Sequence, residues 1–224
     1  AMESGGGAAD AFPGRSTAAG KRKLGGRIGH HGTGTPTVLT AYASKAGVDA
    51  AQLNAIAAAY MPVNGYEIAK SEKSKQRARG IYVHGIQYGE VKPDAFAELL
   101  SWMTPRSGEN FLDIGSGTGK AVLTAAALYP LGSATGIEIQ PALHEAALRA
   151  RERLLGMTEL RVPSDQIRLE LGDALTQPWH AEADLVFCTP TCFTPEMVEA
   201  LCQGVDKLPI GARLAVGHRG DDAH

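Results

Sequence analysis

The sequence predicts an α/β fold built on a doubly wound parallel sheet. From Pro93 onward, apolar runs of strand length alternate with helical stretches. The segment FLDIGSGTGK (residues 111–120) has the pattern of a buried strand, a glycine-rich turn and a helix start. Asp113, Glu138 and Asp173 stand at the ends of three successive predicted strands. Because such sheets bind ligands at the carboxyl ends of their strands, we expect a ligand site there.

The elements follow from apolar periodicity and from helix start signals. Strands are predicted over 111–114, 134–139, 166–171, 183–188 and 213–216, and helices over 37–62, 94–103, 121–129, 141–155 and 195–205. Asp49 is a candidate helix cap, and Pro62 and Pro141 mark a helix end and a helix start.

Three regions are expected along the chain. Residues 1–36 form a Gly/Ala-rich tail predicted to be disordered, residues 37–92 form a small helical segment, and residues 93–224 form the core. The stretch KSEKSKQRAR (residues 70–79) has five positive charges and one negative charge. Composition leaves two interpretations of this stretch open: a solvated helix face, or a patch that contacts phosphates.

Composition excludes several classes of protein. The net charge of −2 predicts no polyanion partner from bulk charge alone. The three cysteines lack metal-ligand spacing, so no metal site is expected and a reduced, intracellular protein is favoured. No apolar run reaches the roughly 20 residues of a membrane span, so no membrane contact is expected.

The glycine turn itself discriminates between cofactors. A triphosphate-binding loop requires glycine where Ile114 stands and Ser or Thr where Ala121 stands, and a dinucleotide loop requires glycine at Lys120. Asp113 would repel a pyrophosphate, but it suits S-adenosylmethionine, which has an ammonium, a sulfonium and no phosphates. The turn therefore predicts S-adenosylmethionine as cofactor, and S-adenosylhomocysteine as product.

Four separated motifs occur in order between residues 70 and 219. They are the basic stretch with IYVHGIQYGEV (81–91), LDIGSGTGK, GIEI, and LVFCTPTCFTPEM (185–197). Together they resemble the Dot-type, non-SET histone H3 lysine methyltransferases, in a divergent eukaryotic branch. The resemblance implies the class I methyltransferase (Rossmann-like) fold, a nuclear location, and methyl transfer to a lysine in the folded core of histone H3 on nucleosomes.

The resemblance also assigns roles to individual residues. It places Tyr88, Glu90, Thr189 and Phe193 at the catalytic channel. The cofactor-binding residues that it implies are Tyr88, Glu90, Val91, Asp113, Gly115, Gly117, Lys120, Glu138, Asp173, Ala174 and Thr189. Lys120 takes a position usually held by Gln, Glu138 holds the ribose, and Asp173 with Ala174 faces the adenine. Nucleosomal DNA phosphates are expected to meet Lys73, Lys75, Arg77 and Arg79.

Two departures from the family pattern leave alternatives open. Thr189-Pro190 replaces a pair of Asn residues, and only eight residues follow the fifth predicted strand, where the family adds a β-hairpin. The terminal hairpin is therefore expected to be missing and the fifth strand to form an edge. The alternatives are an inactive module that binds cofactor and nucleosomes, and a class I enzyme for another protein or a small molecule.

Overall fold

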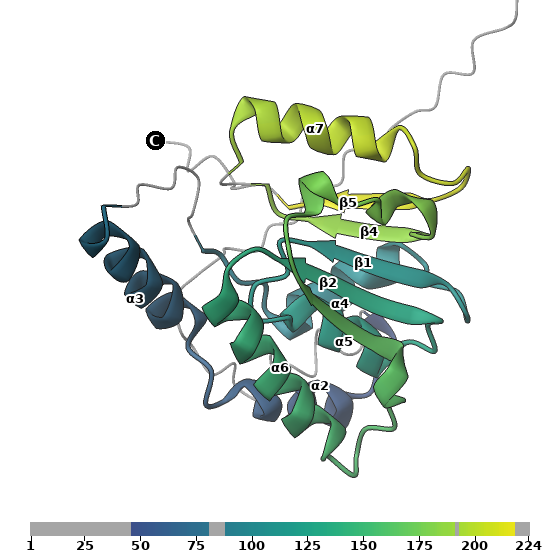
Figure 1. Cartoon of the computed structure of the whole chain (residues 1–224). Coiled ribbons are helices and arrows are strands. Elements are labelled where there is room, and N and C mark those ends of the chain that lie inside the picture. Colours follow the sequence, from purple (N-terminus) through teal and green to yellow (C-terminus); the bar gives the residue numbers. More distant parts are fainter. Residues whose placement is uncertain (1–45, 81–87, 191–192, 218–224) are drawn as a thin grey trace, which may run out of the picture.

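The computed structural model describes residues 46–80, 88–190 and 193–217 (Figure 1). Five strands form one parallel sheet in the order β3-β2-β1-β4-β5. Their bounds are β1 (Asn110–Ile114), β2 (Ser133–Glu138), β3 (Ile167–Leu171), β4 (Leu185–Cys188) and β5 (Arg213–Val216). The predicted doubly wound parallel sheet is confirmed. Since the strand order reverses direction beside β1, the carboxyl end of β1 lies at the switch point where such sheets bind ligands.

Helices cover the two faces of the sheet unequally, as Figure 1 shows. The first face is covered by α2 (Ala50–Tyr60), α4 (Pro93–Trp102), α5 (Lys120–Leu128) and α6 (Pro141–Leu155). Within the described residues, α7 (Pro195–Val205) and the short 3₁₀ turns η2 (Ala174–Thr176) and η3 (Trp179–Ala181) lie on the second face; η1 (Ser164–Gln166) leads into β3. The helices and strands predicted from Pro93 onward all form, with ends that differ by one or two residues.

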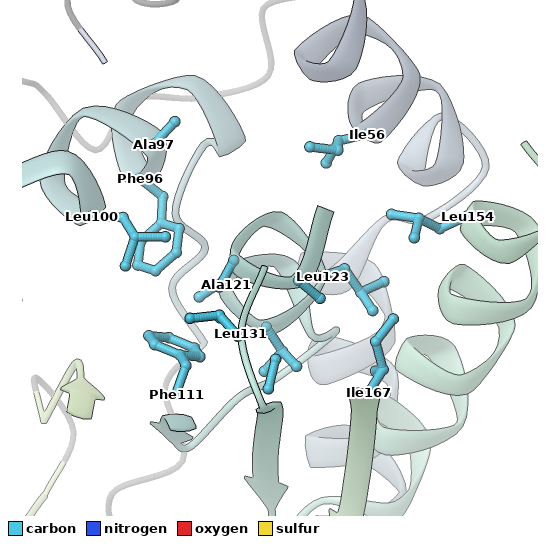
Figure 2. Close-up of a cluster of buried hydrophobic side chains, with 14 of the residues drawn as sticks. Ile56, Phe96, Ala97, Leu100, Phe111, Ala121, Leu123, Leu131, Leu154 and Ile167 are labelled. Atoms are coloured by element: carbon cyan, nitrogen blue, oxygen red, sulfur yellow. The ribbon is translucent and has the colours of Figure 1, made fainter. Parts of the chain in front are cut away.

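Alternating strand residues divide the core into two layers. Phe111 and Phe187 point into the larger cluster, while their neighbours Leu112 and Val186 point into the smaller cluster under α7. Figure 2 shows how Ile56 of α2 reaches the larger cluster, which these helices share. Each fully buried Leu, Ile or Phe contributes about 1.5–3 kcal/mol, so this layer holds the sheet and the N-terminal helical segment together.

The described part of the segment 37–62 is helical, as predicted, with Asp49 as the cap of α2. Gly47 has a left-handed φ of +66°, and α2 begins only after Asp49, whose side chain accepts a hydrogen bond from Ala51 N–H at 2.9 Å. The predicted helix cap at Asp49 is therefore confirmed, and the left-handed Gly47 separates α2 from the helical residue Ala46 before it. Residues 37–45 and the predicted tail over 1–36 lie outside the described residues.

A further helix, α3 (Gly65–Ala78), contains most of the basic stretch. The side chain of Asn64 caps it by accepting from Glu67 N–H at 3.1 Å. Only Gly65 and Ala69, near its start, are buried. The rest of α3, drawn in dark blue, extends away from the sheet in Figure 1.

Among the described residues, β5 pairs with β4, and the residues after 217 lie outside the described part of the chain. No helix in the described part of the chain is long and apolar enough to cross a membrane. The described residues also contain no group of three His, Cys, Asp or Glu side chains able to hold a metal ion.

Candidate functional site

The three predicted acids meet at one edge of the sheet. Asp113 lies near the end of β1, Glu138 ends β2, and Asp173 follows β3, and these three strands are neighbours. The register pairs Ile114 with Ile137, and Glu138 with Leu171, so the three strand ends are level. The three acids therefore stand at the same edge of the sheet, and their role in ligand binding stays a prediction.

The glycine turn between β1 and α5 is held by hydrogen bonds to β2. Gly115 N–H and Ser116 N–H both donate to Ile137 O, at 2.9 and 3.0 Å. Gly117 has a φ of +57° and donates its N–H to Glu138 Oε2 at 2.7 Å. Because glycine has no Cβ, it adopts left-handed backbone conformations without a steric penalty, and the turn can therefore pack tightly against the end of β2.

Glu138 is buried and organises this turn. Its Oε1 accepts from Gln140 N–H at 2.8 Å, while Oε2 holds Gly117. Burial raises the pKa of Glu138, and these backbone hydrogen bonds oppose the rise. Because each carboxylate oxygen has a second lone pair, Glu138 can still accept from two ribose hydroxyls, and this role stays a prediction.

Asp113 is buried without a hydrogen-bond donor among the described residues. Its side chain is 4% exposed, and burial together with the charge of Glu138 raises its pKa from 3.8 to about 8. The other titratable groups that face it are the Tyr60 phenol and the Cys188 thiol, both with raised pKa values. A buried acid without a partner is costly unless a ligand cation pairs with it. Asp113 therefore fits the ammonium group of S-adenosylmethionine.

The segment Tyr88–Glu90 lies across the glycine turn. Tyr88 O–H donates to Glu90 Oε1 and lies 3.1 Å from Thr118 Oγ1. The Tyr88 ring is so close to Gly117 that an added Cβ there would lie 2.8 Å from it. Burial and the nearby charge of Glu90 raise the pKa of Tyr88, so its phenol stays protonated at neutral pH.

Lys120 and Glu90 form an ion pair beside this segment. Lys120 Nζ lies 2.5 Å from Glu90 Oε2, and the two side chains are 17% and 10% exposed. The structure therefore brings together the predicted residues Tyr88, Glu90, Gly117 and Lys120. That this group meets the methionine end of the cofactor stays a prediction.

Other predicted residues take part in local structure. Asp173 accepts from Leu175 N–H at 2.9 Å and so caps η2, while Ala174 is buried in the smaller core cluster. Val91 is partly buried against the larger cluster. Thr189 directly follows β4 and lies close to Gly217. A Cβ added at Gly217 would lie 3.2 Å from Thr189 Oγ1. The contacts of these residues with adenine or with the cofactor stay predictions.

The predicted channel aromatics do not meet in the described structure. Phe193 packs against the smaller core cluster under α7. Within the described residues, neither Phe193 nor Thr189 makes a hydrogen bond or ring contact with Tyr88. The basic residues are placed by α3, where Lys75, Arg77 and Arg79 are exposed and Lys73 is half-buried.

Sequence reasoning missed three polar residues that support the site. Tyr60 O–H donates to Thr118 O at 3.1 Å, and the Tyr66 ring stacks edge-on with Tyr88 at 5.4 Å between centroids. Thr118 lies inside the glycine motif, which could have flagged it. Tyr60 and Tyr66 occupy ordinary helix positions, and nothing in their local pattern indicates that Tyr60 contacts Thr118, 58 residues later, or that Tyr66 contacts Tyr88.

The strand order, the glycine turn and the acids on three strand ends define the class I, S-adenosylmethionine-dependent methyltransferases. Residues 81–217 match the family described as "Histone methylation protein DOT1". The match covers more than half of the chain, and the chain therefore belongs to the DOT1 family of histone methylation proteins. S-adenosylmethionine is the cofactor, as the sequence predicted.

Solved structures share parts of this fold. YjhP from E. coli is 20% identical, with 67% of this chain and 55% of that chain covered and a TM-score of 0.47. A putative S-adenosylmethionine-dependent methyltransferase from Methanococcus maripaludis is 22% identical, with 67% and 62% covered and a TM-score of 0.46. An RNA methyltransferase from Salinibacter ruber in complex with S-adenosylhomocysteine is 23% identical, with 62% and 82% covered and a TM-score of 0.44.

The chain spans 55% and 62% of the length of the first two of these structures, so no activity is carried over from them. The search of curated proteins gave no match.

Proposed function

We propose that this protein is a nuclear histone-lysine N-methyltransferase that acts on a lysine in the folded core of histone H3, on nucleosomes. The family match over residues 81–217 supports histones as the substrate class. The position of α3 supports the nucleosome as the form of the substrate, because this exposed basic helix starts beside the Tyr88–Glu90 segment. A Cβ added at Gly65, the first residue of α3, would lie 2.2 Å from Glu90 Oε1.

The reaction requires a neutral lysine amine. Its nitrogen forms a bond to the methyl carbon while the bond from that carbon to sulfur breaks, and the amine loses a proton. With a reference pKa near 10.4, deprotonation at pH 7 costs about 4–5 kcal/mol. Desolvation beside a sulfonium lowers the pKa of the amine, so positioning can supply much of the rate without a strong general base.

In this proposal, some residues of the chain bind the cofactor and others orient the lysine. S-adenosylmethionine, when bound, supplies the activated methyl group. Asp113 is suited to its ammonium, Glu138 to its ribose, and Asp173 with Ala174 to its adenine. We assign Tyr88, Phe193 and Thr189 to the lysine channel. Glu90 is already paired with Lys120 and Tyr88, which suits it to orientation rather than to proton removal.

The basic residues of α3 contact DNA phosphates in this proposal. These residues lie in the second half of α3 and at its C-cap, beyond the buried start of the helix: Lys73, Lys75, Arg77 and, at the C-cap, Arg79. A 14-residue helix is about 21 Å long, so its free end can reach a neighbouring surface while its start stays at the site. Each phosphate of duplex DNA that the protein neutralises makes the slope of log affinity against log salt concentration more negative by about 0.9.

The experiment is methyl transfer from labelled S-adenosylmethionine to nucleosomes, histone octamers and free histone H3. We expect label on H3 that is greatest with nucleosomes. No transfer to nucleosomes and octamers, beside an active control enzyme, would contradict the proposal. Calorimetric binding of the cofactor without transfer would support the inactive module, which the Thr189-Pro190 departure favours.

A charge-reversal variant tests the role of α3. Reversal of Lys73, Lys75, Arg77 and Arg79 to Glu should weaken nucleosome binding and reduce its salt slope by up to about 4. The matched control reverses four exposed basic residues elsewhere, with the same change in net charge: Arg149, Arg161, Arg168 and Lys207. Equal loss in both variants would assign the effect to net charge, and unchanged activity in the first would favour an enzyme for another substrate.

A further inference from the structure

The ion pair between Lys120 and Glu90 joins two parts of the chain 30 residues apart. Lys120 is the first residue of α5, directly after the glycine turn, and Glu90 belongs to the segment that crosses the turn. Both side chains are more than four-fifths buried. A charge removed from water to this degree requires its partner, so the pair is not comparable to an exposed surface contact.

Glu90 is fully engaged within the protein. Its Oε2 accepts from Lys120, and its Oε1 accepts from Tyr88 O–H and, at 3.2 Å, from Thr118 Oγ1. The last two donors place the Tyr88 ring on Gly117. The Glu90 carboxylate therefore links Lys120 to Tyr88, the tyrosine that covers the turn.

Lys120 is in turn fixed from its other side. Its ammonium lies 5.4 Å from the centroid of the Tyr60 ring, within range of a cation–π interaction, and Tyr60 O–H donates to Thr118 O in the turn. The glycine turn, α2 and the segment around Tyr88 thus converge on one ammonium group. A glutamine, with no charge, could not neutralise Glu90 here.

We infer that Lys120 is a positioning residue: it neutralises Glu90 so that Tyr88 is held over Gly117, and it leaves Asp113 as the acid available to the cation of the ligand. This inference deepens the proposed function and rests on it for the identity of the cofactor. Lys120 is then not primarily a ligand contact. Its effect on cofactor binding passes through Glu90, and charge rather than length decides whether a substitute works.

The first test is a double-mutant cycle on S-adenosylhomocysteine binding, measured by calorimetry. We expect Lys120→Gln to raise Kd about tenfold or more and Lys120→Arg to stay within about threefold of wild type. In a Glu90→Gln background, Lys120→Gln should change Kd less than threefold, because no charge is left to neutralise. The doubly neutral variant also removes the danger that an unpaired buried Glu90 unfolds the protein. An equal effect of Lys120→Gln in both backgrounds would overturn the inference and make Lys120 a direct ligand contact.

The second test needs neither cofactor nor substrate. The protein has six tyrosines, so 3-fluorotyrosine labelling gives a resolvable ¹⁹F spectrum in which Tyr88→Phe assigns one signal. The Tyr88 signal should shift in Lys120→Gln and keep its position in Lys120→Arg. An unmoved signal in Lys120→Gln would overturn the inference. Absence of histone methylation would leave this result intact, so the two proposals fail separately.

Discussion

Replacement of Asp113 by Asn should stabilise the ligand-free protein, and increasingly so as the pH rises. Asp113 is 4% exposed, has no hydrogen-bond donor among the described residues, and has a pKa raised from 3.8 to about 8 by burial and by Glu138. Between pH 3.8 and about pH 8, Asp113 keeps a proton in the folded protein that it has released in the unfolded chain. Folded stability therefore falls as the pH rises through this window.

The magnitude follows from the two pKa values. At about 1.36 kcal/mol for each unit of difference, ionisation of Asp113 costs about 4 kcal/mol at pH 7 and up to about 6 kcal/mol above pH 8. Asparagine is neutral and has nearly the same shape as protonated aspartic acid. We therefore expect Asp113→Asn to match wild type near pH 4 and to exceed it by several kcal/mol at pH 8.5.

Urea unfolding at pH 4, 5.5, 7 and 8.5 measures this difference. Glu138 also has a raised pKa and contributes its own slope, so the difference between the two curves reports Asp113 together with its coupling to Glu138. Parallel stability curves, or a variant less stable than wild type at pH 8.5, would refute the reasoning. Either result would mean that Asp113 is solvated or paired in the free protein.

Cofactor binding should reverse the sign of this effect. An ammonium paired with Asp113 favours its ionised form, so binding below pH 8 should release a proton, detected by calorimetry in buffers of different ionisation enthalpy. Asp113→Asn should abolish this proton release and raise Kd about ten- to a hundredfold, since a hydrogen bond to a charged group contributes about 1.5–3 kcal/mol. An unchanged Kd would assign the ammonium to another group.

Gly117→Ala should lower stability by at least about 1 kcal/mol and abolish cofactor binding, because the residue has a φ of +57° and an added Cβ would lie 2.8 Å from a tyrosine ring. The control Gly89→Ala, where nothing lies within 4 Å of the added Cβ, should leave urea unfolding nearly unchanged; equal losses would contradict the packing argument. In a Cys192→Ser background, Ellman's reagent should label exposed Cys202 rapidly and Cys188 only on unfolding, because burial raises the pKa of the Cys188 thiol to about 12. Two rapidly reacting thiols in the folded protein would show that β4 is more open than described.

The sheet could be predicted from the sequence because its signals are local. Strand and helix periods, the glycine turn and the acids after each strand lie within a few residues of the structure that they specify. The parallel arrangement then brings Asp113, Glu138 and Asp173 to one edge without further information. The break at Gly47 within the helical segment 37–62 could not be predicted in this way, because one backbone torsion decides it and a glycine is compatible with either conformation.

The functional state of each acid could not be predicted in the same way, because it depends on partners distant in the sequence. Asp113 and Glu90 are both buried carboxylates beside the glycine turn, yet Glu90 has Lys120, Tyr88 and Thr118 as donors, whereas Asp113 has none among the described residues. Sequence motifs assign both acids to the cofactor. In the structure, Glu90 is paired inside the protein, whereas Asp113 keeps no such partner among the described residues.

This difference between Glu90 and Asp113 explains why a lysine at position 120, where the family usually has Gln, is important for cofactor binding. With glutamine there, Glu90 would keep its negative charge, and two acids would compete for one ligand ammonium. With lysine, the charge of Glu90 is cancelled inside the protein, and only Asp113 gains a counter-ion when the ligand binds. The loss of cofactor affinity caused by Asp113→Asn should then be smaller in a Lys120→Gln background, because a Glu90 without its lysine can pair with the ligand ammonium instead. An equal loss of affinity in both backgrounds would show that Glu90 does not compete for the ammonium, and the division of roles between the two acids would be wrong.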